Sequence, residues 1–185
     1  METAFVTLIV LVVLFAILAF IDGVFLHLYK YRLYAHSESK FEHLTHTIRA
    51  FLFLGIVYFL YYKIEYNSFF YFGLLFVAID IIVLTVDAYV EKDSRTFMGD
   101  LPRWEYILHL FVNGFHFAGI AVILIIKIRL TENGIMFNSS FQNAASFDIF
   151  RIISLNLMPG AFVIALLHIL PYFSKADLLP KFKCC

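Results

Sequence analysis

The sequence predicts an all-α integral membrane protein, folded as a single transmembrane domain of five helices over residues 1–185. Hydrophobic residues make up 62% of the chain and charged residues only 15%, against roughly 45–50% and about a quarter in soluble domains. The 23 Phe and 11 Tyr add apolar surface that a soluble domain of this length could not bury. The 14 basic and 14 acidic side chains balance, so nothing indicates a basic patch for a nucleic acid partner.

Five stretches are long and apolar enough to cross a bilayer. A crossing needs about 20 mostly apolar residues, and in lipid a helix satisfies its own backbone hydrogen bonds. We therefore expect helices at about 4–29, 45–63, 68–90, 104–128 and 148–172.

The stretches differ at their ends. The first is not expected to be a cleaved signal, because Met1-Glu2-Thr3 lacks a positive n-region and the apolar run is too long. A polar segment at 30–44 leads to the second, and a tight turn at 64–67 leads to the third. Residues 91–103 are charged and hold a Gly and a Pro, whereas 129–147 are rich in Asn and Ser. In the fifth stretch, Pro159 predicts a kink because it removes a helix hydrogen bond.

The distribution of basic residues predicts the orientation. With five crossings, 30–44, 91–103 and the tail 173–185 share one side. Ten basic residues lie toward that side and four toward the other, so the positive-inside rule makes the first side cytoplasmic and leaves the N-terminus outside. The ten are Lys30, Arg32, Lys40, Arg49, Lys92, Arg95, Arg103, Lys175, Lys181 and Lys183, and the four are Lys63, Lys127, Arg129 and Arg151.

Histidines and acids inside or beside the stretches gather in the half nearest this predicted cytoplasmic side. Each ionisable group in a bilayer costs on the order of 2.5–3.5 kcal/mol on insertion scales, so such groups indicate function. In order along the chain, they are Asp22 and His27, then Glu42, His43 and His46, then Asp80, Asp87 and Glu91, then Glu105, His109 and His116, and finally His168.

Depth separates two of these residues from the rest. At about 1.5 Å per residue, Asp80 lies roughly 16 Å below Glu91, and His116 roughly 16 Å below Glu105. We therefore expect Asp80 and His116 to pair with each other or with Asp22.

Imidazoles and carboxylates from several helices predict a divalent metal centre facing the cytoplasm. Imidazole suits zinc, copper, iron and nickel, and carboxylate favours iron or manganese. The ligands outnumber the three or four of one zinc, which favours two ions, with iron preferred and zinc as the alternative. The predicted ligands are His27, His43, His46, Asp87, Glu91, Glu105, His109 and His168, supported by hydrogen bonds from Asp22, Glu42, Asp80 and His116.

Such a centre predicts an oxidoreductase that hydroxylates or desaturates a lipid or other apolar substrate. An electron-donor protein would supply the electrons. In general arrangement the site resembles that of the histidine-rich membrane desaturases and hydroxylases. Their HxxHH boxes are approached only by His43-Leu44-Thr45-His46, which lacks the second following His, so no family is assigned.

Three other functions remain open. The first is a zinc hydrolase of lipids, with Glu105 or Asp87 as the catalytic carboxylate that activates a zinc-bound water. The second is a non-enzymatic metal- or proton-binding protein, because chains of Asp, Glu and His mark ion pathways. A haem anchor is the least favoured, since axial ligation needs no acids.

Overall fold

The computed structural model describes residues 1–141 and 143–173 and contains, in that part of the chain, five helices long and apolar enough to cross a membrane. The number of such helices agrees with the five predicted from the sequence. The helices are α1 (Glu2–Ala19) with the π-helix η1 (Phe20–Lys30), α2 (Lys40–Ile56) with the π-helix η3 (Val57–Tyr62), α3 (Asn67–Ser94), α4 (Arg103–Lys127) and α5 (Ala145–Phe173). Short 3₁₀ turns, η2 (Leu33–Ala35) and η4 (Thr96–Met98), lie in two of the connections.

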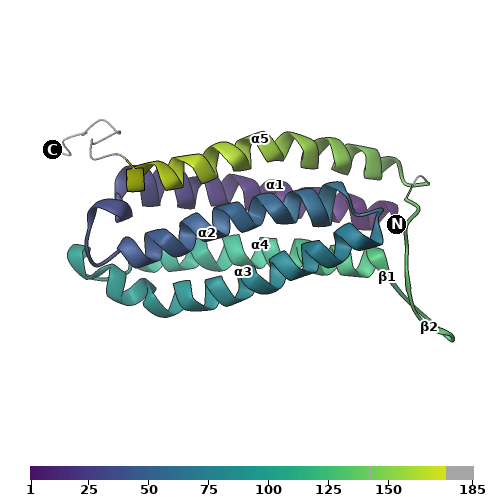
Figure 1. The fold of residues 1–185 in the computed structure, drawn as a ribbon, viewed down its shortest axis with the longest axis horizontal. Helices are drawn as coiled ribbons and strands as arrows, with labels where there is room; N and C mark the ends of the chain where they lie inside the picture. Colours follow the sequence, from purple (N-terminus) through teal and green to yellow (C-terminus); the bar gives the residue numbers. More distant parts are fainter. Residues whose placement is uncertain (142, 174–185) are drawn as a thin grey trace.

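The helices lie side by side along the length of the molecule (Figure 1). Helix α2 packs against α3 and α5, and α1 packs against α4 and α5, whereas α3 and α4 approach each other less closely. We call the end that carries the N-terminus and the strands the hairpin end, and the end with segments 31–39 and 95–102 the site end.

Segment 129–147, expected to be an Asn/Ser-rich loop, contains a β-hairpin. Strand β1 (Ile128–Thr131) pairs antiparallel with β2 (Gly134–Phe137), with Leu130 opposite Ile135. The turn includes Asn133-Gly134, and Gly134 has a φ of 111°, a conformation that Gly adopts without strain. Asn-Gly is a strong hairpin signal, but hydropathy does not register it.

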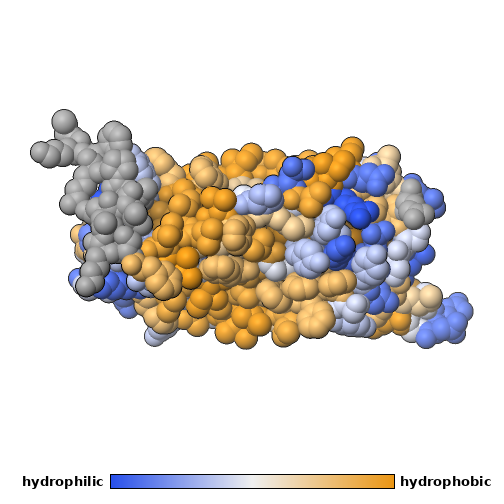
Figure 2. Space-filling view, turned by 45° about the horizontal axis from the view of Figure 1, so that its top comes forward, coloured by the Kyte–Doolittle hydropathy of each residue, from blue (hydrophilic) through white to orange (hydrophobic). Residues whose placement is uncertain are grey.

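The apolar core fills the hairpin half of the bundle. Residues from all five helices meet there, and the largest include Phe5, Ile56, Leu60, Tyr61, Phe70, Ile123 and Phe150. On the outside, Figure 2 shows a broad hydrophobic band over the middle of the molecule, hydrophilic residues toward its ends, and a hydrophilic patch that reaches from the hairpin end toward the middle of this face. The band fits a bilayer. The orientation remains a prediction from the charge count, and Lys175, Lys181 and Lys183 in that count lie outside the described residues.

Close packing of α3 on η3 depends on Gly73. A Cβ at Gly73 would lie 2.8 Å from the Leu60 Cβ and 3.1 Å from its Cα, so a side chain there must push the helices apart. We expect Gly73→Leu to destabilise the fold by about 1–3 kcal/mol, the usual cost of overpacking. Thermal unfolding of the detergent-solubilised protein measures this. Gly114→Leu is the matched control, because a Cβ at Gly114 meets nothing within 4 Å. Equal melting of the two variants would contradict the close packing.

Candidate metal centre

The π-helix η1 places two candidate ligands on one face. Asp22 and His27 are five residues apart, and on an α-helix of 3.6 residues per turn they would point about 140° apart. In a π-helix the hydrogen bonds run from i to i+5, so residues five apart lie one above the other. Accordingly, Nε2 of His27 lies 3.4 Å from Oδ1 of Asp22. π-Helical turns are frequent at functional sites.

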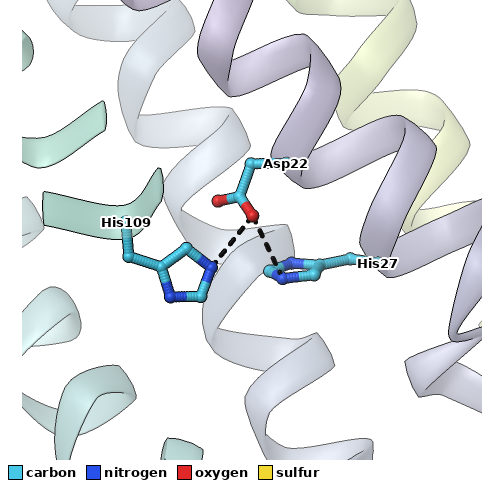
Figure 3. Close-up of side chains that lie close together, drawn as sticks. All are labelled: Asp22, His27 and His109. Atoms are coloured by element: carbon cyan, nitrogen blue, oxygen red, sulfur yellow. Dashed lines mark hydrogen bonds and ion pairs between the residues drawn. The ribbon is translucent and has the colours of Figure 1, made fainter. Parts of the chain in front are cut away.

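The first ligand group consists of Asp22, His27 and His109. Oδ1 of Asp22 points toward both imidazoles and lies 2.9 Å from Nε2 of His109 (Figure 3). On its other side, Nδ1 of His109 forms an ion pair with Glu91. Two elements distant in sequence, η1 and α4, therefore supply one carboxylate and two imidazoles. Glu91, predicted as a ligand, lies outside both ligand groups and pairs with the opposite nitrogen of the His109 ring.

The second ligand group consists of His27, Glu42 and His46. Nε2 of His46 lies 3.6 Å from Oε1 of Glu42 and 3.4 Å from Oδ2 of Asp87. The rings of His27 and His46 meet edge to face with their centroids 4.2 Å apart. Asp87 also accepts a hydrogen bond from Thr45, which orients it toward His46.

In each group the three ligand atoms lie within 4.8 Å of one another. Two ligands on one ion with bonds of about 2.0–2.2 Å can be at most about 4.4 Å apart. Small rotations of the side chains would therefore allow the three ligand atoms of either group to coordinate one ion. The described part of the chain thus contains two buried His/carboxylate groups able to hold a metal, and they share His27.

Arg95 lies at the centre of the site and was not among the predicted residues. Its side chain is fully buried. It forms an ion pair with Glu42, and Nη2 lies 2.6 Å from Oε1 of Glu105 and 3.2 Å from Nε2 of His27. Glu105, predicted as a ligand and catalytic carboxylate, is therefore held by a guanidinium through Oε1, while its buried Oε2 has no hydrogen-bond partner.

A deeper layer confirms the predicted pairing of Asp80 with His116. Nε2 of His116 lies 3.1 Å from Oδ2 of Asp80. The other carboxylate oxygen accepts a hydrogen bond of 3.2 Å from Nε of Arg49, and Nη2 of Arg49 donates to Asn113 at 2.9 Å. From the sequence, Arg49 is expected to contribute only to the charge asymmetry of the two sides. Here it links α2 to α3 and α4.

Two predicted ligands, His43 and His168, lie apart from both groups. Nε2 of His43 donates a hydrogen bond of 3.0 Å to the backbone carbonyl of His168. The two rings stack with their centroids 5.4 Å apart. His168 faces η1, because a Cβ on Gly23 would lie 3.4 Å from its Nε2. Each Nδ1 is buried without a hydrogen-bond partner. Both residues lie at the predicted end of the bundle, with His43 in the α2–α5 contact and the His168 ring facing η1.

The charges of this polar cluster do not balance. Six carboxylates meet two guanidiniums, those of Arg49 and Arg95, which leaves four negative charges in excess. All the carboxylates except Glu91 are buried, and the Glu91 side chain is only 14% exposed. Buried charges are costly unless they are paired. Cations or protons must therefore accompany these carboxylates, which are Asp22, Glu42, Asp80, Asp87, Glu91 and Glu105.

Comparison with known protein families, with curated proteins and with solved structures found no match. The interpretation of the site therefore depends on its own chemistry.

Neutralising Arg95 should be strongly destabilising. Arg95→Met preserves length and apolar volume but leaves Glu42 and Glu105 as unpaired buried carboxylates. Removing one partner of a buried ion pair costs about 3–5 kcal/mol. Chemical unfolding in detergent should show this loss, whereas Arg103→Met on the exposed start of α4 should change little.

The double variant Arg95→Met/Glu105→Gln separates charge from packing. If the charge is responsible, removing one unpaired carboxylate should restore part of the lost stability. No recovery in the double variant, or a loss as small as that of Arg103→Met, would show that Arg95 does not balance the acids.

Proposed function

We propose that the chain is a membrane metalloenzyme, an oxidoreductase whose His/carboxylate centre binds two divalent ions, iron in preference, and oxidises a lipid or other apolar substrate. The observation that carries the proposal is the pair of ligand groups joined at His27. Each group offers two imidazoles and one carboxylate, the ligand set of non-haem iron oxygenases that leaves coordination positions open for substrates.

The charge of the cluster is compatible with two ions, and protons on the carboxylates and imidazoles would balance it in their absence. Two divalent cations would supply the four positive charges that the arginines leave unmatched. The two groups share His27, so both ions could be bound together only if its imidazole used one ring nitrogen for each ion. For the second ion, Asp87 stands 3.4 Å from His46 and provides an additional oxygen. Such a centre at the site end would face the cytoplasm in the orientation predicted from the charge count.

An apolar cavity adjoins the ligands and supports an apolar substrate. Its volume is about 250 Å³, and Asp22 and His46, one residue from each ligand group, form part of its wall. The rest of the wall is mainly apolar. Ligand sites of this kind combine an apolar lining with a few polar groups that provide orientation and chemistry.

In the proposed reaction, the substrate loses a C–H bond and gains a C–O bond. One atom of O₂ enters the product and the other leaves as water, with two electrons and two protons supplied by a reduced electron-donor protein. Metals bound to the two groups would supply the oxygen chemistry. The protein's own residues position the ligands: Glu91 holds His109, and Thr45 orients Asp87.

A zinc hydrolase remains the second candidate, because two histidines and one carboxylate also form a catalytic zinc site. Of the two predicted catalytic carboxylates, Asp87 is then the better placed, because its Oδ2 lies 3.4 Å from Nε2 of His46. Glu105 instead forms an ion pair with Arg95. The metal that co-purifies with the protein distinguishes the candidates.

Metal content tests the proposal directly. Elemental analysis of the detergent-purified protein should find two irons per chain; one zinc would favour the hydrolase. His27→Ala should abolish binding because both groups need His27, whereas His109→Ala or His46→Ala should each leave one ion. His36→Ala, a histidine stacked on Phe97 outside both groups, is the control and should keep both. A metal-free protein, or equal metal in His27→Ala and the parent, would refute the proposal.

The iron form should also oxidise lipid. When chemically reduced protein in lipid vesicles is exposed to O₂, mass spectrometry of the extracted lipid should show a gain of one oxygen atom or a loss of two hydrogens. His27→Ala should give neither product. Release of a cleaved acyl chain without O₂ would instead support the hydrolase.

A further inference from the structure

The cavity beside the ligand groups lies between the helices in the middle of the bundle. Helix α5 contributes Asn156, Gly160, Ile164 and His168, which are spaced by four and therefore lie on one helical face. The α1 side contributes small residues, Ala16, Ala19 and Gly23, which leave room for an occupant.

The cavity has a mouth on the side of the bundle. Three of the residues that line it are exposed at the molecular surface, namely Phe20 (53%), Asn156 and Gly160. All three lie well inside helices long and apolar enough to span the membrane. A Cβ at Gly160 would meet nothing within 4 Å, so the space in front of it is open. The mouth therefore faces the lipid chains of the bilayer.

Aromatic rings close the cavity toward the hairpin end. The ring centroids of Phe15 and Phe53 are 4.8 Å apart, and that of Phe15 is 4.9 Å from His116. Beneath this floor begins the apolar core, with Val12 one turn further along α1.

At the opposite end of the cavity stand Asp22, His46 and His168. His168 is only 2% exposed, and its Nδ1 has no hydrogen-bond partner. The cavity therefore leads from the mouth to members of both ligand groups, along a wall that is mainly apolar but also includes the ion pair of Arg49 and Asp80.

We propose that this cavity binds one acyl chain of a membrane lipid, which enters sideways from the bilayer between α1 and α5 and lies on the floor formed by Phe15 and Phe53. The mouth lies between helices that are long and apolar enough to span a membrane, so an acyl chain could enter it directly from the bilayer. The mainly apolar wall of the cavity matches such a chain. The role of the chain as the oxidised substrate rests on the proposed function, but its binding requires no metal.

Photocrosslinking tests the binding. The protein in lipid nanodiscs is illuminated with a fatty acid that carries a diazirine in its tail, and the labelled residues are mapped by mass spectrometry. We expect label on Phe15, Phe53 and Leu157, which line the cavity. Gly160→Phe should fill the mouth and reduce this labelling about tenfold, equivalent to about 1.4 kcal/mol of binding.

Gly114→Phe is the matched control. Gly114 is another exposed helical glycine with nothing within 4 Å of its Cβ position, but it does not line the cavity, so labelling should be unchanged. Phe15→Ala provides a second variant that opens the floor, and it should extend the label to Val12. Labelling confined to the outer helix faces, or equal labelling in Gly160→Phe and Gly114→Phe, would overturn the inference.

Metal content of the same samples separates the two proposals. Gly160→Phe should keep its metal, because Gly160 belongs to neither ligand group. Cavity labelling in a metal-free protein would refute the proposed function alone. A protein with two irons and no label in the cavity would refute the acyl-chain site alone.

Discussion

The site end of this protein is organised by the need to compensate buried negative charge. The backbones of α3 and α4 come less close to each other than α3 comes to α2 or α4 to α1. Even so, four polar contacts join α3 and α4 or link both of them to α2. His109 pairs with Glu91, Arg95 with Glu105, His116 with Asp80, and Arg49 bridges Asp80 and Asn113. In a low-dielectric interior such contacts are strong only if every member is satisfied. The excess of four carboxylates thus links stability to whatever cation or proton the site holds.

The separation of the bundle into an apolar hairpin half and a polar site half explains how the fold tolerates so many buried polar groups. The hairpin half contains the apolar core, where Phe5 alone contacts three other aromatic rings, those of Phe141, Phe147 and Phe150. Packing there holds helices from all parts of the bundle together, and polar contacts such as that of Ser146 with Glu2 add to it. The site half is then free to keep unpaired groups, such as Nδ1 of His27 and Oε2 of Glu105, which a purely structural network would not leave buried and unsatisfied.

Much of this arrangement could be predicted from the sequence, because hydropathy and the direction of successive crossings determine which residues share an end of the bundle. The five crossings and the Asp80–His116 pair follow from that reasoning. Rotation about each helix axis does not. His43 lies at the expected end but in the α2–α5 contact, His168 belongs to neither ligand group, and Asp22 joins the ligands only because η1 winds as a π-helix. Helical spacing rules assume 3.6 residues per turn, so they place Asp22 and His27 on different faces.

Arg95 shows what a charge argument could have added. In the sequence it is one basic residue in the polar segment 91–103 and carries no signal of burial. Six carboxylates converging from four helices, however, require cations among them, and an arginine at the end of a helix that already carries three of them is the nearest source. Its guanidinium forms ion pairs with both Glu42 and Glu105 and lies within hydrogen-bond distance of His27, the residue common to both ligand groups. Arg95 therefore limits how many carboxylates remain for metal, and it leaves Asp22, Oε1 of Glu42 and Asp87 as the oxygens nearest the shared imidazole and His46.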